Sequence, residues 1–320
     1  MFKWKKLGKV FDPTELKELD WIKEFAQAPS VLIFENFIRV YFSCRPAPDS
    51  NGQYVSYSAY VDLDRKNFFK IIDIAKKPIL ELGQLGTFDE FGIYPVSVIR
   101  NEDNISLYYA GWTRCESVPF NVAIGMAESY DEGVLFEKKG HGPILSYSVD
   151  EPFVLSGPKI RKFDNKWYLF YIAGRKWVDS NGGPEPVYKI RLATSDDGLN
   201  WNKLGRDLIE SRTEKDEAQA SPDVIFKNGK YHMFFCYRSS ENFRGKKGSY
   251  RVGYAYSADL INWIRDDGKA GIDVSGDGWD SEMISYPHVF EVDGKIYMFY
   301  LGNQFGKYGF GAAQLEGELN

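Results

Sequence analysis

Apolar and polar residues alternate in nearly the same order along two segments of the chain. Residues 220–239, ASPDVIFKNGKYHMFFCYRS, and residues 284–303, ISYPHVFEVDGKIYMFYLGN, each pass from a proline through a short apolar strand and a tight turn to an aromatic-rich strand. Three further copies begin at Ala28, Tyr94 and Gly157. The prolines lie at positions 29, 95, 158, 222 and 287, so the copies repeat every 63 to 66 residues. A repeat of this length predicts a fold built from equivalent units.

Each copy continues with a third alternating strand, such as YRVGYAYS at 250–257, and four copies add a fourth aromatic-containing segment. Five units of four strands predict an all-β fold, a five-bladed β-propeller with antiparallel blades. The fifth copy ends before its fourth strand, but KWKKLGKV at 3–10 is similar to NWNKLGRD at 200–207. We therefore predict that residues 1–10 complete blade five and remove an open sheet edge. We expect one domain over residues 1–320, with blades starting near residues 28, 94, 157, 221 and 286.

The segment SDDGLNW at 195–201 predicts a tight turn between a third and a fourth strand. Weaker copies of it occur as SADLINW and SYDEGVLF. Such turns belong to the outer rim of a propeller, so we do not place the functional site there.

Composition narrows the choice of partners. The net charge of −5 argues against a nucleic acid as the main partner, and an aromatic content of 16% suits stacking against sugar rings. Three cysteines without a CxxC pair argue against a disulfide framework. The N-terminus lacks the apolar segment of a signal peptide, and no window is long and apolar enough to span a membrane. We expect a cytoplasmic protein without membrane association and leave its oligomeric state open.

Candidate catalytic residues come from comparing equivalent positions of the five copies. The first strand of every blade lines the central channel of a propeller, so equivalent positions face one cavity. Acidic residues precede most of the prolines, and two follow an aromatic residue, in TFDE at 87–90 and GWDSE at 278–282. A pair of carboxylates beside aromatic platforms is what cleavage of a glycosidic bond requires. The candidate catalytic residues are Asp89, Glu217 and Asp280.

Substrate-binding candidates occupy the same acidic positions, the positions around the prolines and the ends of the second strands. They are Glu90, Glu151, Glu282, Arg45, Arg175, Arg238, Trp112, Tyr286, His288 and Asn303. An acid at a fixed place in a repeat can instead cap a turn or pair with an arginine of the neighbouring blade, and this structural alternative stays open. The three histidines are scattered over three blades, so we predict no metal site, and no motif predicts a cofactor.

The segments GTFDEFGIYPVSVI, DGKIYMFYLGNQFGKYGFGAA and SDDGLNW resemble those of five-bladed glycoside hydrolases of families 43, 32 and 130. The resemblance covers essentially the whole chain and is nearest to uncharacterised glycosyl hydrolase-like proteins. It implies a first-blade Asp as base, a third-blade Asp as helper and a fourth-blade Glu as acid, and Glu217 has the place of that Glu. The first blade has QAPSV at 27–31 instead of an Asp beside the proline, so Asp89 and Asp280 are substitutes.

These observations favour a carbohydrate-active enzyme that cleaves or transfers a glycosyl unit. A phosphate-dependent glycoside phosphorylase is an alternative, because a cluster of arginines can hold inorganic phosphate. A non-catalytic glycan-binding propeller is a second alternative, since the usual first-blade Asp is missing. In each case the expected partner is a glycan or a small saccharide.

Overall fold

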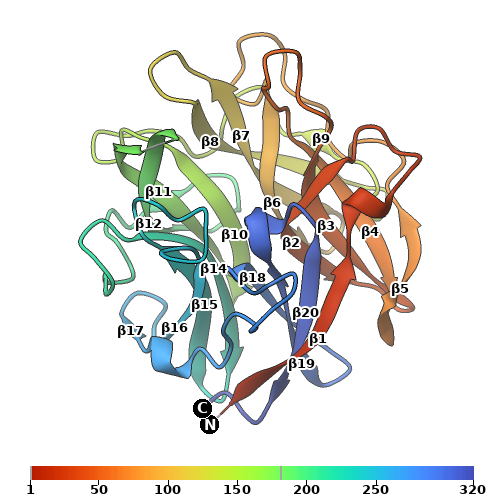
Figure 1. Ribbon diagram of the computed structural model, residues 1–320, viewed down its shortest axis with the longest axis vertical. Helices are drawn as coiled ribbons and strands as arrows, with labels where there is room; N and C mark the ends of the chain where they lie inside the picture. The colour runs from red at the N-terminus through yellow and green to blue at the C-terminus, as the bar shows by residue number, and fades with distance from the viewer. Residues whose placement is uncertain (1, 181) are drawn as a thin grey trace.

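Five four-stranded antiparallel sheets form a ring around a central axis in the computed structural model, which describes residues 2–180 and 182–320 (Figure 1). Met1, part of the predicted closing segment, lies outside the described residues, as does residue 181. Blade one contains β2 (Glu24–Ile33), β3 (Phe37–Arg45), β4 (Tyr57–Asp64) and β5 (Asn67–Ile74). Blade two contains β6 (Gly92–Arg100), β7 (Ile105–Arg114), β8 (Phe120–Ser129) and β9 (Glu137–Lys138).

The other three blades repeat this order of strands. Blade three contains β10 (Leu155–Phe163), β11 (Lys166–Ser180), β12 (Gly183–Ser195) and β13 (Asn202–Lys203). Blade four contains β14 (Ala218–Lys227), β15 (Lys230–Arg238), β16 (Arg251–Ser257) and β17 (Trp263–Arg265). Blade five contains β18 (Ser285–Val292), β19 (Lys295–Leu301), β20 (Phe310–Glu316) and β1 (Lys3–Phe11). The helical segments are short: η1 (Pro13–Glu15), η2 (Asp267–Lys269) and α1 (Asn303–Gly306).

The N-terminal strand closes the ring as predicted. β1 pairs antiparallel with β20, so one blade is built from both ends of the chain, and the two termini lie side by side in Figure 1. Trp4 of β1 is 5% exposed and packs edge-on against Phe234 of blade four, with ring centroids 5.2 Å apart. The segment therefore seals an edge and also fills the space between two blades.

The hairpins between first and second strands follow from their turn residues. Asn228 and Gly229 have φ of 49° and 77°, and Asp293 and Gly294 have φ of 52° and 73°. Two successive residues with positive φ form the hairpin turn that matches the twist of the flanking strands, which explains the NGK and DGK signatures. The SDDG turn also lies where it was predicted, between β12 and β13, with the Gly198 N–H donating to Ser195 Oγ at 2.9 Å.

Each first strand carries a bulge directly before its second half. The register breaks around the repeat proline in all five blades. In four blades the residue before the proline has a left-handed φ of 50–60°: Ala28, Gly157, Ser221 and Tyr286. The bulge interrupts the alternation of side chains between the two faces of the strand. Residues before and after the proline therefore do not follow one continuous two-residue period.

Among the described residues, no helix is long and apolar enough to cross a membrane.

Candidate active site

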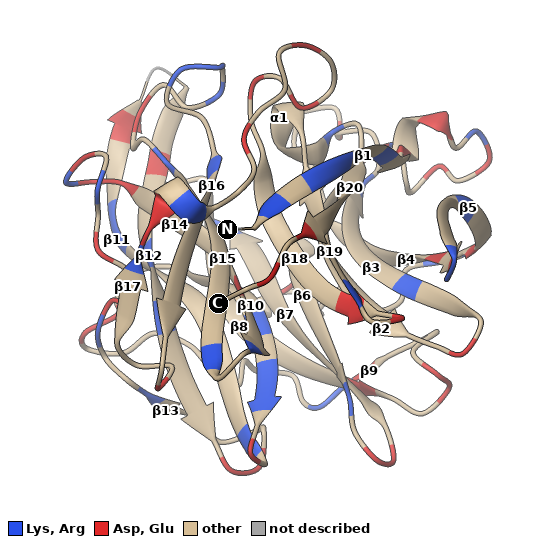
Figure 2. Cartoon of the chain, turned by 90° about the horizontal axis from the view of Figure 1, so that it is seen from below, with Lys and Arg blue, Asp and Glu red and all other residues tan. Residues whose placement is uncertain are grey.

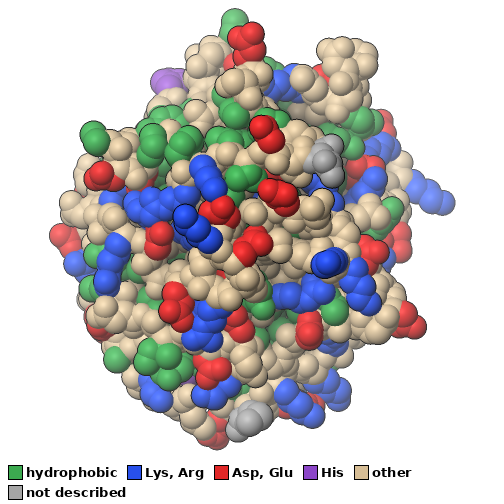
Figure 3. Space-filling view, turned by 60° about the vertical axis from the view of Figure 1, so that its left-hand side comes forward, with side chains coloured by type: hydrophobic (Ala, Val, Ile, Leu, Met, Phe, Trp, Pro, Cys, Tyr) green, Lys and Arg blue, Asp and Glu red, His purple; other side chains and the backbone are tan. Residues whose placement is uncertain are grey.

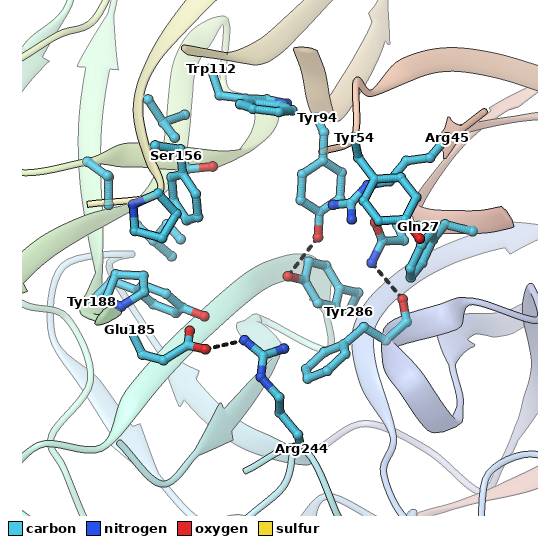
Figure 4. A pocket seen from close by; sticks show the side chains of 18 of the residues that line it. Gln27, Arg45, Tyr54, Tyr94, Trp112, Ser156, Glu185, Tyr188, Arg244 and Tyr286 are labelled. Carbon is cyan, nitrogen blue, oxygen red and sulfur yellow. Dashed lines mark hydrogen bonds and ion pairs between the residues drawn. The ribbon is translucent and has the colours of Figure 1, made fainter. Parts of the chain in front are cut away.

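A cavity of about 780 Å³ opens at the centre of the ring (Figure 4). It lies where several second strands end, and its wall includes residues of all five blades. Four of the predicted binding residues line it: Arg45, Trp112, Arg238 and Tyr286. A cavity of this size is typical of small-molecule sites.

Two of the predicted catalytic carboxylates, Asp89 and Asp280, lie inside their blades and do not line the cavity. Asp89 is 1% exposed and lies 2.6 Å from Lys138 Nζ, while Asp280 is 3% exposed and lies 2.7 Å from Lys6 Nζ. In each blade a second-strand tyrosine hydroxyl donates to the carboxylate at 3.0 Å; these are Tyr109 and Tyr300. Both carboxylates therefore hold a second strand and a fourth strand together.

Glu217 has the same kind of environment in blade four and does not line the cavity either. It is buried, lies 2.6 Å from Arg265 Nη1, and accepts hydrogen bonds from Thr213 Oγ1 at 2.8 Å and Gln219 Nε2 at 2.8 Å. Burial raises the pKa of Glu217, but the hydrogen bonds from Arg265, Gln219 and Thr213 outweigh burial and hold this pKa below its ordinary value. The interactions keep Glu217 ionised, which does not suit the predicted role of general acid.

Glu151 completes the set in blade three. Its side chain is 2% exposed and contacts Arg191 at 2.7 Å and Lys203 at 2.6 Å, and Tyr171 donates to it at 2.8 Å. Burial raises the pKa of Glu151, but the hydrogen bonds from Lys203, Arg191 and Tyr171 leave it below its ordinary value. The predicted convergence of these carboxylates at the mouth of the channel is not what the structure shows, because each is neutralised inside its own blade.

The basic partners come from one repeated position on the fourth strand, two residues after the aromatic residue. They are Lys138, Lys203, Arg265 and, from the closing strand β1, Lys6. Figure 2 shows the basic residues along β1. Blade one departs from this pattern, because the residue at that position, Lys70, is exposed and pairs with Asp64. The first-blade acid, Glu24, instead lines the cavity.

Glu24 and Glu185 are the two carboxylates among the described residues that line the cavity. Glu24 stands at the start of β2, where Lys307 Nζ lies 3.0 Å away and the Tyr54 hydroxyl donates at 3.2 Å. Glu185 stands on the β11–β12 hairpin and pairs with Arg244, which comes from the loop after β15 (Figure 4). The candidate acids thus come from blades one and three.

Five tyrosines line the cavity. The Tyr94 hydroxyl donates to the Tyr286 hydroxyl at 2.9 Å (Figure 4), and the hydroxyls of Tyr188 and Tyr250 are also hydrogen-bonded to each other. Burial raises the pKa of Tyr94 to about 12 and that of Tyr286 well above its ordinary value. These phenols remain protonated near neutral pH and offer hydroxyl groups and flat rings to a ligand.

The remaining predicted binding residues lie away from the cavity lining. Glu90 accepts a hydrogen bond from the Gly86 N–H at 2.9 Å, and Arg175 pairs with Asp207. Asn303 Oδ1 accepts a hydrogen bond from the backbone N–H of Glu282 at 2.8 Å, and this bond stabilises the segment that precedes β18 of blade five. The structural alternative, in which such residues cap turns or pair within the fold, describes the side-chain contacts of Glu90, Arg175 and Asn303.

His288 belongs to a buried charged cluster on the first strands. Its Nδ1 donates to Asp223 at 2.7 Å, and its Nε2 accepts from the Val31 N–H at 3.0 Å. Lys159 Nζ lies 3.5 Å from Asp223, and Arg161 also contacts this carboxylate. Burial lowers the pKa of His288 to about 4, so the imidazole is neutral near neutral pH. The cluster joins four blades and does not line the cavity.

Sequence comparison of the copies missed several cavity residues, among them Gln27, Tyr54, Ser156, Glu185, Tyr188 and Arg244. Glu185 and Tyr188 sit on a hairpin that is longer than its counterparts, and Tyr54 sits in an irregular segment before β4. Tyr94 also lines the cavity, and its signal in the sequence was its place directly before a repeat proline, which it shares with the predicted Tyr286. Within residues 2–180 and 182–320, no three His, Cys, Asp or Glu side chains are grouped as a metal site.

Comparison with known proteins finds similarity along nearly the whole chain. An uncharacterised protein of Mycobacterium tuberculosis strain H37Rv, Rv1502, is 36% identical over 314 residues, which cover 98% of this chain and 99% of the relative. A β-1,2-mannobiose phosphorylase of Thermoanaerobacter sp. strain X514 is 27% identical over 177 residues, about half of each protein. No protein-family profile matches the chain.

Solved structures share the fold at low sequence identity. One comes from work on the GH130 family of mannoside phosphorylases, which contains glycoside hydrolases that target β-1,2 mannosidic linkages in Candida mannan. It superposes with a TM-score of 0.72 at 16% identity and covers 98% of this chain and 94% of the other. The expected five-bladed fold of the glycoside hydrolases is thereby confirmed.

Proposed function

Because the chain belongs to the family of the mycobacterial protein Rv1502 and has the fold of five-bladed glycoside hydrolases, we propose that it is a carbohydrate-active enzyme. It cleaves or transfers a glycosyl unit in the central cavity. The observation that carries this proposal is the pair of cavity carboxylates, Glu24 and Glu185, contributed by two different blades next to aromatic side chains.

Glycosidic cleavage needs one carboxylic acid to protonate the leaving oxygen and one carboxylate to activate water or to stabilise the oxocarbenium-like charge. Lys307 and Tyr54 hold the Glu24 carboxylate in one orientation, so we assign Glu24 the second role. Arg244 is 63% exposed, and an entering glycoside can displace it from Glu185. We therefore assign Glu185 the role of proton donor.

The predicted binding residues divide between two tasks in this proposal. Trp112 and Tyr286 provide flat surfaces against which sugar rings stack. Arg238 holds the cavity wall, because its guanidinium donates to the Pro186 carbonyl at 2.9 Å and the Ser239 carbonyl at 2.8 Å. The substrate is a glycan or small saccharide.

Turnover of a panel of aryl glycosides and oligosaccharides tests the proposal. Glu24→Gln and Glu185→Gln should each lower kcat by a factor of about 10²–10⁴. Glu185→Gln should hurt a substrate with a poor leaving group more than one with a good leaving group, since only the former needs protonation. Glu291→Gln, which removes a surface partner of Lys227, is the matched control and should keep full turnover. Full turnover by both cavity variants would contradict the assignment.

Phosphorolysis is a second candidate, and the partial similarity to the β-1,2-mannobiose phosphorylase favours it. The same panel run with and without inorganic phosphate separates the two reactions, because phosphorolysis yields a sugar phosphate and stops when phosphate is removed. Saccharide binding without turnover under either condition would support the non-catalytic alternative instead.

A further inference from the structure

Two arginines occupy the same position at the ends of second strands, yet their surroundings differ. Arg238 is 2% exposed, and acceptors of the protein surround its guanidinium: two backbone carbonyls at 2.8 and 2.9 Å and the hydroxyls of Tyr250 and Tyr188 at 3.3 and 3.4 Å. Its ring contact with Phe243, at 3.5 Å to the centroid, covers one face. Arg238 therefore has little capacity left for a ligand.

Arg45, its counterpart in blade one, has far fewer hydrogen-bond acceptors around its guanidinium. The single hydrogen bond of its guanidinium within the described residues runs from Nε to Ser56 Oγ at 3.2 Å, and the guanidinium forms no ion pair there. Aromatic rings surround the guanidinium, with the centroids of Phe25, Tyr54 and Tyr94 at 4.7, 5.3 and 6.0 Å. Figure 4 shows Tyr54 and Tyr94 beside Arg45. The two NH₂ groups of Arg45 are thus left for something that enters the cavity.

The charged side chains that line the cavity also favour a negatively charged ligand. Five cationic side chains and two carboxylates line it, although the chain as a whole carries a net charge of −5. Figure 3 shows charges of both signs interspersed over one outer face, whereas cations outnumber carboxylates in the cavity lining. Lys307 is paired with Glu24, Arg244 with Glu185, and Arg114 with Asp49 at 3.6 Å. Arg238 has no carboxylate partner in the part of the chain that the structure describes, but neutral acceptors of the protein surround its guanidinium. Among the described residues, Arg45 is therefore the cation of the cavity that has neither an ion pair nor a set of protein acceptors.

Tyr286 adds a second donor next to this arginine. Its hydroxyl oxygen accepts a hydrogen bond from the Tyr94 hydroxyl, so its own O–H is left to donate to an acceptor in the cavity. A guanidinium with two NH₂ groups and a phenol hydroxyl together match an anion that has two or three oxygens, because planar bidentate contacts suit carboxylates and phosphates.

We propose that Arg45, with Tyr286, forms a subsite for an anionic oxygen group, a carboxylate or a phosphate, so that the ligand of the cavity is acidic. The anion is either an acidic group on the saccharide or free inorganic phosphate used as a second substrate. The inference rests on the proposed function only in taking the ligand to be a saccharide, since anion binding is measured without turnover.

Isothermal titration of the full chain with inorganic phosphate, D-glucuronate and neutral D-glucose tests the subsite. The wild type should bind at least one anion more tightly than glucose, and less tightly as NaCl rises from about 0.05 to 0.5 M. Arg45→Lys, which keeps the charge but loses the planar fork, should weaken this binding about tenfold, and Arg45→Met should weaken it further. Arg65→Lys, at an exposed pair with Asp293, is the matched control and should bind like the wild type.

The outcomes separate the two sources of the anion. Arg45-dependent binding of phosphate alone identifies free phosphate, and Arg45-dependent binding of glucuronate alone identifies an acidic saccharide. Anion binding that is equal in the wild type and both Arg45 variants, or no preference of the wild type for either anion over glucose, would overturn the proposal. The wild-type comparison holds even if an Arg45 variant does not fold. Loss of turnover in the glycoside panel leaves this result untouched, so failure of the subsite and failure of the proposed enzyme are distinguishable.

Discussion

Replacing Glu217 with Gln distinguishes a structural role of this residue from a catalytic one. The substitution keeps the size of the side chain but removes its charge opposite Arg265, whose side chain is 1% exposed. Breaking a buried ion pair by removing one partner costs about 3–5 kcal/mol, because the other charge remains buried. Arg265 keeps Asp267 at 2.8 Å, so we expect the lower end, about 3 kcal/mol.

A loss of about 3 kcal/mol corresponds to a fall in Tm of about 4–5 °C for a chain of 320 residues. Thermal unfolding followed by circular dichroism measures it, with Glu291→Gln as a surface control that should change the free energy of unfolding by less than about 0.5 kcal/mol. Turnover measured beside the melts separates the two roles. An unchanged Tm together with a 10²–10⁴-fold loss of kcat would refute the structural role and restore Glu217 as the general acid.

Three further predictions concern stability. The pKa values of Glu151 and Glu217 in the folded protein lie below their ordinary values, so the two ionised carboxylates stabilise the fold above about pH 4.5. This stabilisation should be lost as the pH falls below that value. Acid unfolding that is as steep in Glu151→Gln as in the wild type would contradict this prediction. Deleting residues 1–10 removes β1 and Trp4 and should cost at least about 3–5 kcal/mol, whereas a melt within a degree or two of the intact chain would refute closure. Arg238→Lys should lower the Tm more than Arg45→Lys, because only Arg238 is held by several acceptors of the protein; equal melting temperatures would contradict this difference.

The architecture could be predicted from the sequence because the repeat is local and regular. Proline spacing, hairpin turns and strand alternation each recur, and the similarity of residues 3–10 to residues 200–207 gave the closing strand. The same similarity contained a further clue. Lys6 and Lys203 stand at equal places in the two segments, and both neutralise buried carboxylates of their blades.

The site was harder to predict because a repeated acid has two physical uses. Acids in blades two to five are matched by a base on the fourth strand, which makes them part of the repeat. In blade one Glu24 lines the cavity, and the lysine at the equivalent fourth-strand position, Lys70, is exposed and pairs with Asp64 instead. Glu185 lies on the long β11–β12 hairpin and Arg244 on the loop after β15, and neither segment has a counterpart at fixed spacing, so comparison of repeats could not find them.

A crystal structure with a bound saccharide tests whether the chemistry belongs to the central cavity. We expect a sugar stacked on Trp112, with the oxygen of the scissile bond within about 3.2 Å of the Glu185 carboxyl group. A saccharide bound outside the cavity, or one that reaches the carboxylates of Asp89, Glu217 or Asp280 instead, would contradict it.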